Sequence, residues 1–116
     1  MNPPTPIGNT GLVLHVTVRV ASAHADLFRQ FVRRHIARTQ AKPGCNGYTF
    51  AQDVDADDTF HIVEGWTDRA ALDAHNADPA FRQWLGQLVS QVRILSRTTE
   101  MYVVGRHERA SPLDAA

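Results

Sequence analysis

The sequence predicts an α+β domain in which one β-sheet carries two helical segments on the same face. Apolar side chains recur at every second position in four segments, and at every third or fourth position in the segments between them. With 116 residues, the chain forms one domain with one modest core. The order strand–helix–strand–strand–helix–strand is the split β-α-β pattern called ferredoxin-like. We expect a flexible segment at 1–11, the folded domain at 12–104, and a tail at 105–116 that is mobile or rests on a partner.

The first half of the pattern is a strand, a helix and a second strand. Residues 12–20 alternate, with Leu14, Val16 and Val18 on one face and polar residues on the other. Residues 23–40 form a helix for which Ser22 is a candidate N-cap. The apolar stripe of this helix is Phe28, Phe31, Val32, His35, Ile36 and Thr39. The Lys-Pro-Gly sequence at 42–44 ends the helix, and residues 45–53 form the second strand.

The second half repeats the pattern with a helical segment that is broken in two. An Asp-rich loop at 55–58 leads into a third strand at 59–67. Thr67 or Asp68 caps a short helix that runs to about Asn76, and Asp78 caps another with Pro79 in its first turn. This last helix carries a core stripe formed by Phe81, Trp84, Leu85 and Leu88. The final strand runs from about 92 to 104.

One face of the predicted sheet has no helix to cover it. The side chains on this face are Val13, His15, Thr17, Arg19, His61 and Val63. This mixture is too apolar for simple exposure and too polar for a core. Packing against a second copy would cover it, so we expect a two-fold homodimer that forms a dimeric α/β barrel.

Composition excludes several classes of function. Twelve basic residues balance twelve acidic ones, so we expect neither nucleic acid nor a membrane surface as a partner. Cys45 is the only cysteine and cannot form an internal disulfide. The histidines have no metal-ligand spacing, and no glycine-rich phosphate loop or nucleophile elbow occurs. Residues 1–11 lack the pattern of a signal peptide, which favours a cytoplasmic protein.

The candidate site lies on the third strand. Alternation places Glu64 and Trp66 on the largely apolar inner face, and a short helix returns His75 to the same end of the strand. A buried carboxylate needs a hydrogen-bond donor, which could be a backbone amide or Tyr48 in a purely structural role. Trp66 and His75 could likewise be ordinary core residues. The alternative is a small apolar pocket with polar groups aimed into it.

His35 leaves two interpretations open. It lies in the middle of an apolar helix stripe, where leucine would pack better, so it could face the pocket or snorkel at the edge of the stripe. We expect the pocket to be lined by His35, Tyr48, Phe28, Val16 and Phe81.

Four motifs together resemble the antibiotic biosynthesis monooxygenase family, which includes quinol monooxygenases. They are PGCNGY at 43–48, EGW at 64–66, AALDAH at 70–75 and PAF at 79–81. The resemblance implies a dimeric α+β barrel with one apolar cavity in each protomer. It also implies oxidation of a small phenolic, quinol or polyketide-type substrate by O₂ without a cofactor or metal. In this scheme His75 is the base or proton shuttle, Trp66 is the aromatic wall and N–H donor, and Glu64 orients one of them.

Two departures from the family pattern narrow the choice among the reactions known in the family. A second histidine that many members carry is Ala80 here, and no asparagine occurs among the inward positions Leu14, Val16 and Val18. Haem degradation is therefore the less favoured branch. Isomerisation of a small carbonyl metabolite, with His75 and Glu64 as an acid/base pair, and non-catalytic binding of an apolar ligand remain as alternatives.

Overall fold

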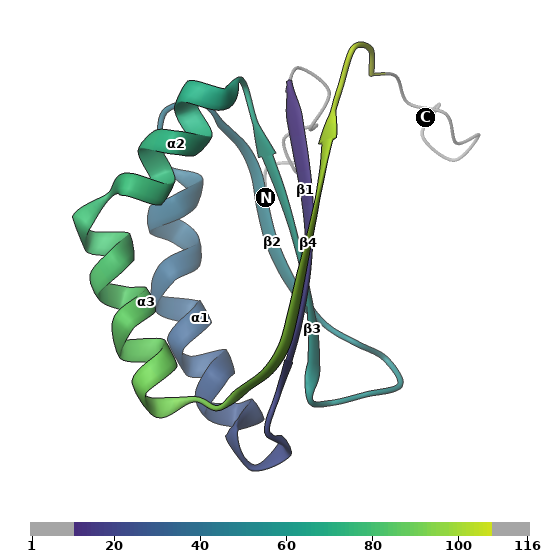
Figure 1. The fold of residues 1–116 in the computed structure, drawn as a ribbon, viewed down its shortest axis with the longest axis vertical. Helices are drawn as coiled ribbons and strands as arrows, with labels where there is room; N and C mark the ends of the chain where they lie inside the picture. The colour runs from purple at the N-terminus through teal and green to yellow at the C-terminus, as the bar shows by residue number, and fades with distance from the viewer. Residues whose placement is uncertain (1–10, 108–116) are drawn as a thin grey trace, which may run out of the picture.

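A computed structural model describes residues 11–107, so most of the N-terminal segment and most of the C-terminal tail lie outside the described residues. One antiparallel sheet has the strand order β2-β3-β1-β4, and the helices form a layer on one of its sides (Figure 1). The elements are β1 (Leu12–Val20), α1 (Ala25–Gln40), β2 (Cys45–Gln52), β3 (Thr59–Trp66), α2 (Arg69–Ala77), α3 (Pro79–Gln91) and β4 (Ile94–Val103). This confirms the predicted α+β, ferredoxin-like class.

The predicted alternation along β1 is confirmed residue by residue. Leu14, Val16 and Val18 are buried against the helices, whereas His15 and Thr17 on the other face are half-exposed. β1 pairs with β3 and with β4, and its partner opposite Leu14 on β3 is Glu64. Paired residues in an antiparallel ladder point to the same face, so Glu64 also points inward. The register of the site strand is therefore as the sequence predicts.

Aspartate caps begin both short helices. The Asp68 carboxylate accepts a hydrogen bond from the backbone N–H of Ala71, and that of Asp78 accepts one from Ala80. Both are standard N-caps, which hold α2 and α3 in place directly after β3.

The start of α1 differs from the prediction. Ser22 does not cap the helix, because residues Ser22–His24 form a 3₁₀ turn and α1 begins at Ala25. The ring of His24 instead accepts a hydrogen bond from the backbone N–H of Arg93, which ties the start of α1 to the entrance of β4.

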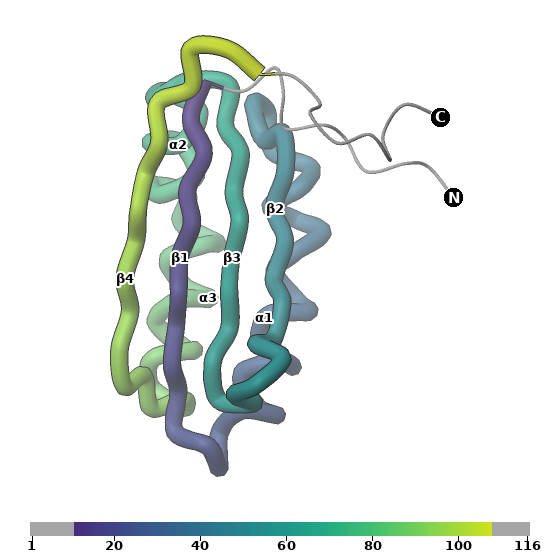
Figure 2. Tube along the Cα trace, turned by 90° about the vertical axis from the view of Figure 1, so that its right-hand side faces the viewer, coloured from purple at the N-terminus to yellow at the C-terminus, as the bar shows by residue number. Residues whose placement is uncertain are grey.

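β4 lies at the edge of the sheet, beyond the helix layer (Figure 2). Most of its residues are exposed, and Leu85 of α3, which we expected in the core stripe, is 39% exposed. The stripe prediction is wrong at this position because β4 is not covered by α3, and the space between them is the mouth of a cavity. No helix within residues 11–107 is long and apolar enough to cross a membrane.

Candidate functional site

A cavity of about 820 Å³ lies between the sheet and the helices. Most of its wall is apolar, with a few polar groups, which is the usual composition of a small-molecule site. Most of its exposed wall residues belong to α3 and β4, and Asn76 near the end of α2 is exposed as well, so the mouth opens along the side where these elements face one another. The wall includes Leu14, Val18, Phe28, Tyr48, Phe50, Ile62, Glu64, Leu72, His75, Phe81, Arg82, Trp84, Leu85, Leu88, Val89, Ile94, Arg97 and Thr99.

Glu64 and Trp66 form a hydrogen-bonded pair on the inner face of β3. The indole Nε1–H of Trp66 donates to Oε1 of Glu64 at 3.0 Å, and both residues are buried. The donor that satisfies the buried carboxylate is therefore the indole, and not Tyr48 or a backbone amide. Because its N–H is used in this way, Trp66 holds Glu64 in position at the cavity wall.

His75 is held between two aromatic rings and an ammonium group. Its ring stacks on Trp66 with centroids 4.9 Å apart and packs against Phe81 at 4.2 Å. Nζ of Lys42 donates to Nδ1 of His75 at 2.7 Å and forms an ion pair with Asp78 at 2.8 Å. The imidazole thus has one nitrogen engaged on the side away from the cavity.

A turn at Gly44 brings Lys42 into contact with His75. Gly44 has φ of +78°, a left-handed conformation that favours glycine, and a Cβ at this position would lie 2.5 Å from Cβ of Ala71. The turn therefore packs directly against α2, the helix that carries His75. The backbone N–H of Thr67 donates to the carbonyl of Gly44 at 2.8 Å and closes the turn onto the end of β3.

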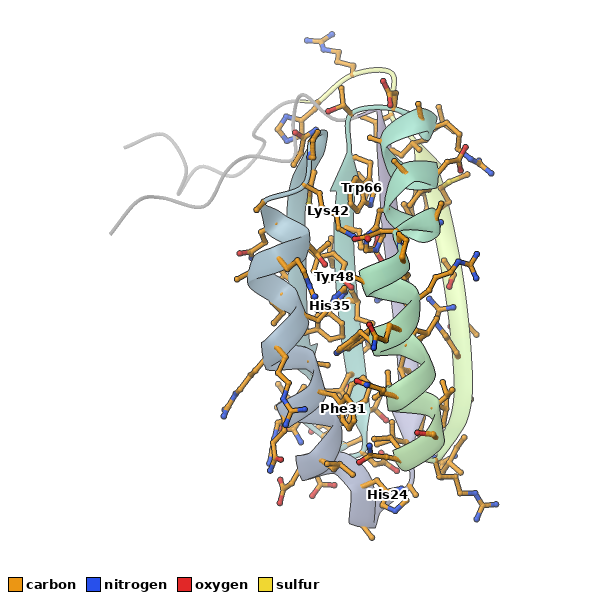
Figure 3. All side chains as sticks on the ribbon, turned by 90° about the vertical axis from the view of Figure 1, so that its left-hand side faces the viewer. His24, Phe31, His35, Lys42, Tyr48 and Trp66 are labelled. Atoms are coloured by element: carbon orange, nitrogen blue, oxygen red, sulfur yellow. The ribbon has the colours of Figure 1, made fainter. Side chains whose placement is uncertain are left out.

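His35 belongs to a second layer behind the cavity. Its Nε2 lies 2.8 Å from the hydroxyl of Tyr48, and its ring stacks on Trp84 with centroids 4.1 Å apart. The labelled side chains of Lys42, Tyr48 and His35 follow one another in the gap between α1 and the α2–α3 pair (Figure 3). His35 is fully buried, so it does not snorkel to the surface.

Burial and neighbouring charges lower the pKa of both histidines of the site and raise the pKa of Glu64. The pKa of His75 is lowered to about 4, mainly by burial and then by the charge of Lys42, against the opposing effect of Asp78. Burial is also the main cause that lowers the pKa of His35 to about 3. Burial raises the pKa of Glu64, although the N–H of Trp66 and the charge of Arg97 oppose this.

The structure brings most of the residues predicted for the site to one cavity. Glu64, His75, Tyr48, Phe28 and Phe81 line it. The other three predicted residues are buried but do not line the cavity, and they are Trp66, His35 and Val16.

Sequence analysis missed four charged residues at the site, and they are Lys42, Asp78, Arg82 and Arg97. We interpreted Lys42 only as part of a helix stop and Asp78 only as a cap, yet Lys42 binds His75 from the outside and Asp78 forms an ion pair with Lys42. Arg97 lines the mouth on β4, close enough to Glu64 to oppose the rise of its pKa. No local pattern marks these residues, because the residues that they contact are distant in the sequence. Within residues 11–107, no group of three or more His, Cys, Asp or Glu side chains could hold a metal ion.

The sequence and the fold both have known relatives. The sequence profile of the antibiotic biosynthesis monooxygenase family matches residues 11–87. An uncharacterized protein of Synechocystis sp. is 30% identical over 74 residues, which are 64% of this chain and 50% of that protein. The chain therefore spans about half the length of this relative.

Two solved structures show the same fold. One is a putative antibiotic biosynthesis monooxygenase from Deinococcus radiodurans, with a TM-score of 0.79, 23% identity, and coverage of 86% of this chain and 98% of that one. The other is a mutant of SnoaB, a cofactor-independent oxygenase from Streptomyces nogalater, with a TM-score of 0.69 and 19% identity. This match covers 83% of the present chain and 94% of SnoaB.

Proposed function

Because the chain belongs to the antibiotic biosynthesis monooxygenase family, we propose that it is a cofactor-independent monooxygenase. The proposed substrate is a small phenolic, quinol or polyketide-type aromatic compound that reacts with O₂. The observation that carries the proposal is that Glu64 and His75 both line one largely apolar cavity of about 820 Å³. A volume of this size accommodates an aromatic substrate of a few fused rings.

The proposed reaction needs only a few contributions from the protein. Removal of a proton from an electron-rich phenol gives an anion that can itself transfer an electron to O₂. After the two radicals combine, one oxygen atom stays in the substrate and the other leaves as water. The protein supplies a base, a hydrogen-bond donor for the developing negative charge, and an apolar chamber that excludes water. Glu64 and His75 are the polar groups proposed for the first two tasks.

Oxygen uptake tests this proposal directly. We expect the purified protein to consume dissolved O₂ when it is mixed with anthrones or quinols, and to do so without added flavin. Dialysis against a chelator should leave the rate unchanged. Failure to consume O₂ with every compound of these classes would contradict the oxygenase proposal, as would loss of the activity on chelation.

A second candidate is supported by the arginines at the mouth. Arg82 and Arg97 both line the cavity, where they could bind an anionic group of a small carbonyl compound. Glu64 would then move a proton between carbons while His75 donates to the carbonyl oxygen, so the reaction is an isomerisation. Exchange of a substrate C–H for deuterium from D₂O, without any O₂ uptake, would favour this candidate. Binding of an aromatic ligand with neither reaction would favour a binding protein.

We also propose a homodimer that forms across the uncovered face of the sheet. Every helix within residues 11–107 lies on the other side (Figure 1), and this face carries half-exposed valines at positions 13 and 63. Burial of such side chains against a second copy is favourable.

Sedimentation of the protein at micromolar concentration tests the dimer. We expect twice the mass of one chain, and we expect Val63→Asp to shift the protein toward monomer, because the variant places two carboxylates in the interface. Val54→Asp is the matched control, since Val54 is 99% exposed in the loop between β2 and β3. A wild-type monomer, or an equal effect of both variants, would contradict the interface.

A further inference from the structure

Lys42 is the only lysine in the sequence, where every other basic side chain apart from histidine is arginine. Its side chain is only 16% exposed and ends between His75 and Asp78. Nζ lies 2.7 Å from Nδ1 of His75 and 2.8 Å from Oδ2 of Asp78. A lysine ammonium is a compact point charge, so it fits between these two acceptors, whereas the planar fork of arginine has a different shape.

The contact determines which nitrogen of His75 carries the proton. An ammonium group has donors and no acceptor, so Nδ1 of His75 must accept the hydrogen bond from Lys42. A neutral imidazole has one N–H, which must then be on Nε2. The ion pair with Asp78 holds the ammonium group of Lys42 in this position.

The surroundings of His75 hold the ring in this orientation. Trp66 and Phe81 pack against it from two sides, and rotation of the ring would have to displace them. His75 lines the inner cavity, and it also lines a depression on the outer surface together with Lys42 and Asp78. One edge of the imidazole thus faces Lys42, which leaves the other for the cavity.

We propose that Lys42 is a positioning residue that holds His75 as the Nε2–H tautomer, so that His75 is a hydrogen-bond donor in the cavity. The tautomer itself does not depend on the proposed function. Only the roles that it implies for Glu64 and His75 in the reaction rest on that function. With Nδ1 occupied and Nε2 protonated, His75 has no free lone pair for a substrate proton. The base is then Glu64, whose carboxylate receives the proton of the substrate O–H, while Nε2–H of His75 stabilises the oxygen anion that remains.

The low pKa of His75 supports the same assignment. An imidazole that stays neutral down to about pH 4 does not become a second cation beside Lys42 at neutral pH.

Nitrogen NMR of the full-length protein tests the tautomer without any substrate. Long-range ¹H–¹⁵N spectra at about pH 7.5 should show an unprotonated Nδ1 and a protonated Nε2 for His75, which is assigned by the signals that disappear in His75→Gln. Lys42→Met keeps an unbranched side chain near Phe81 and removes the ammonium group. The Nδ1 signal should then move toward the protonated type, because Asp78 remains and the cation does not. Arg38→Met removes another nearby cation that makes no contact with His75, and should leave both signals unchanged.

The outcomes separate this inference from the proposed function. A protonated Nδ1 in the wild type, or unchanged signals in Lys42→Met, would overturn the role of Lys42 even if the protein consumes O₂. Conversely, the expected spectra without any O₂ uptake would support the tautomer and contradict the oxygenase. With an active substrate, Lys42→Met should lower kcat by up to about 10²-fold with little change in KM, since the lost donor acts on charge that develops during the reaction.

Discussion

Replacement of Glu64 by glutamine is expected to lower the rate of O₂ consumption by about 10²–10⁴-fold, the usual contribution of a general base. Glutamine has the size of glutamate, and its side-chain oxygen can still accept the hydrogen bond from Trp66. The variant therefore removes the basic carboxylate and leaves the cavity wall in place. Since a neutral amide is easier to bury than a carboxylate, Glu64→Gln should be at least as stable to urea as the wild type.

The pH dependence of the wild-type rate provides a second measurement. Because the pKa of Glu64 is raised by burial, the active carboxylate form should be lost on acidification at a higher pH than for an ordinary glutamate. Asp73→Asn is the matched control, because Asp73 is exposed on α2 and its carboxylate pairs with the exposed Arg69. A fully active Glu64→Gln variant would show that another group removes the substrate proton.

Mild acid is expected to destabilise the fold through two buried histidines. The pKa of His35 is lowered to about 3 and that of His75 to about 4, while an unfolded histidine titrates near 6.5. Between these values the unfolded chain binds protons that the folded chain does not, so stability is complete above about pH 7 and falls as the pH decreases below 6.5. From about pH 7.5 to about pH 5, each histidine should lower the free energy of unfolding by about 2 kcal/mol.

Other titratable groups with shifted pKa values change the free energy of unfolding little between about pH 5 and pH 7.5. The lowered pKa values of Asp53, Asp58 and Asp78 affect stability only at lower pH, near and below the ordinary pKa of aspartate. The raised pKa of Glu64 has the opposite effect, because protonation of Glu64 favours the folded state as the pH decreases. The loss near pH 5 should therefore be somewhat smaller than the sum of the two histidines.

Urea unfolding at several pH values between 5 and 7.5 measures this effect. His35→Asn should remove about half of the pH dependence, even if it also lowers stability at every pH. His107→Asn, which changes an exposed histidine, should leave the dependence unchanged. A stability that is constant over this range would mean that His35 and His75 accept protons in the folded protein.

Much of the fold was predictable because the signals are local. Alternation along β1 and β3 determined which side chains face the helices, and therefore that Glu64 and Trp66 are buried. Aspartates before Ala71 and Ala80 marked the starts of α2 and α3 correctly. These signals depend on the period of a strand or a helix, or on a cap within three residues, so one sequence suffices to detect them.

The start of α1 shows where local reasoning fails. Ser22 has the right chemistry for a cap, but the chain makes a 3₁₀ turn there, and His24 bonds to Arg93, which is 69 residues away. Leu85 fits the helical period of the core stripe, yet it is exposed because the edge strand β4 leaves an open cavity beside it.

The sequence by itself therefore determined the fold class, the family, the inward face of β3 that carries Glu64 and Trp66, and the short helix that carries His75. Only the tertiary structure decided how these groups are paired. In the folded protein the indole N–H of Trp66 donates to Glu64, and Lys42 contacts Nδ1 of His75, which is 33 positions away in the chain. The physical reason is that periodicity specifies the direction of a side chain relative to its own element. Hydrogen-bond partners and cavity walls depend instead on how separate elements pack against one another.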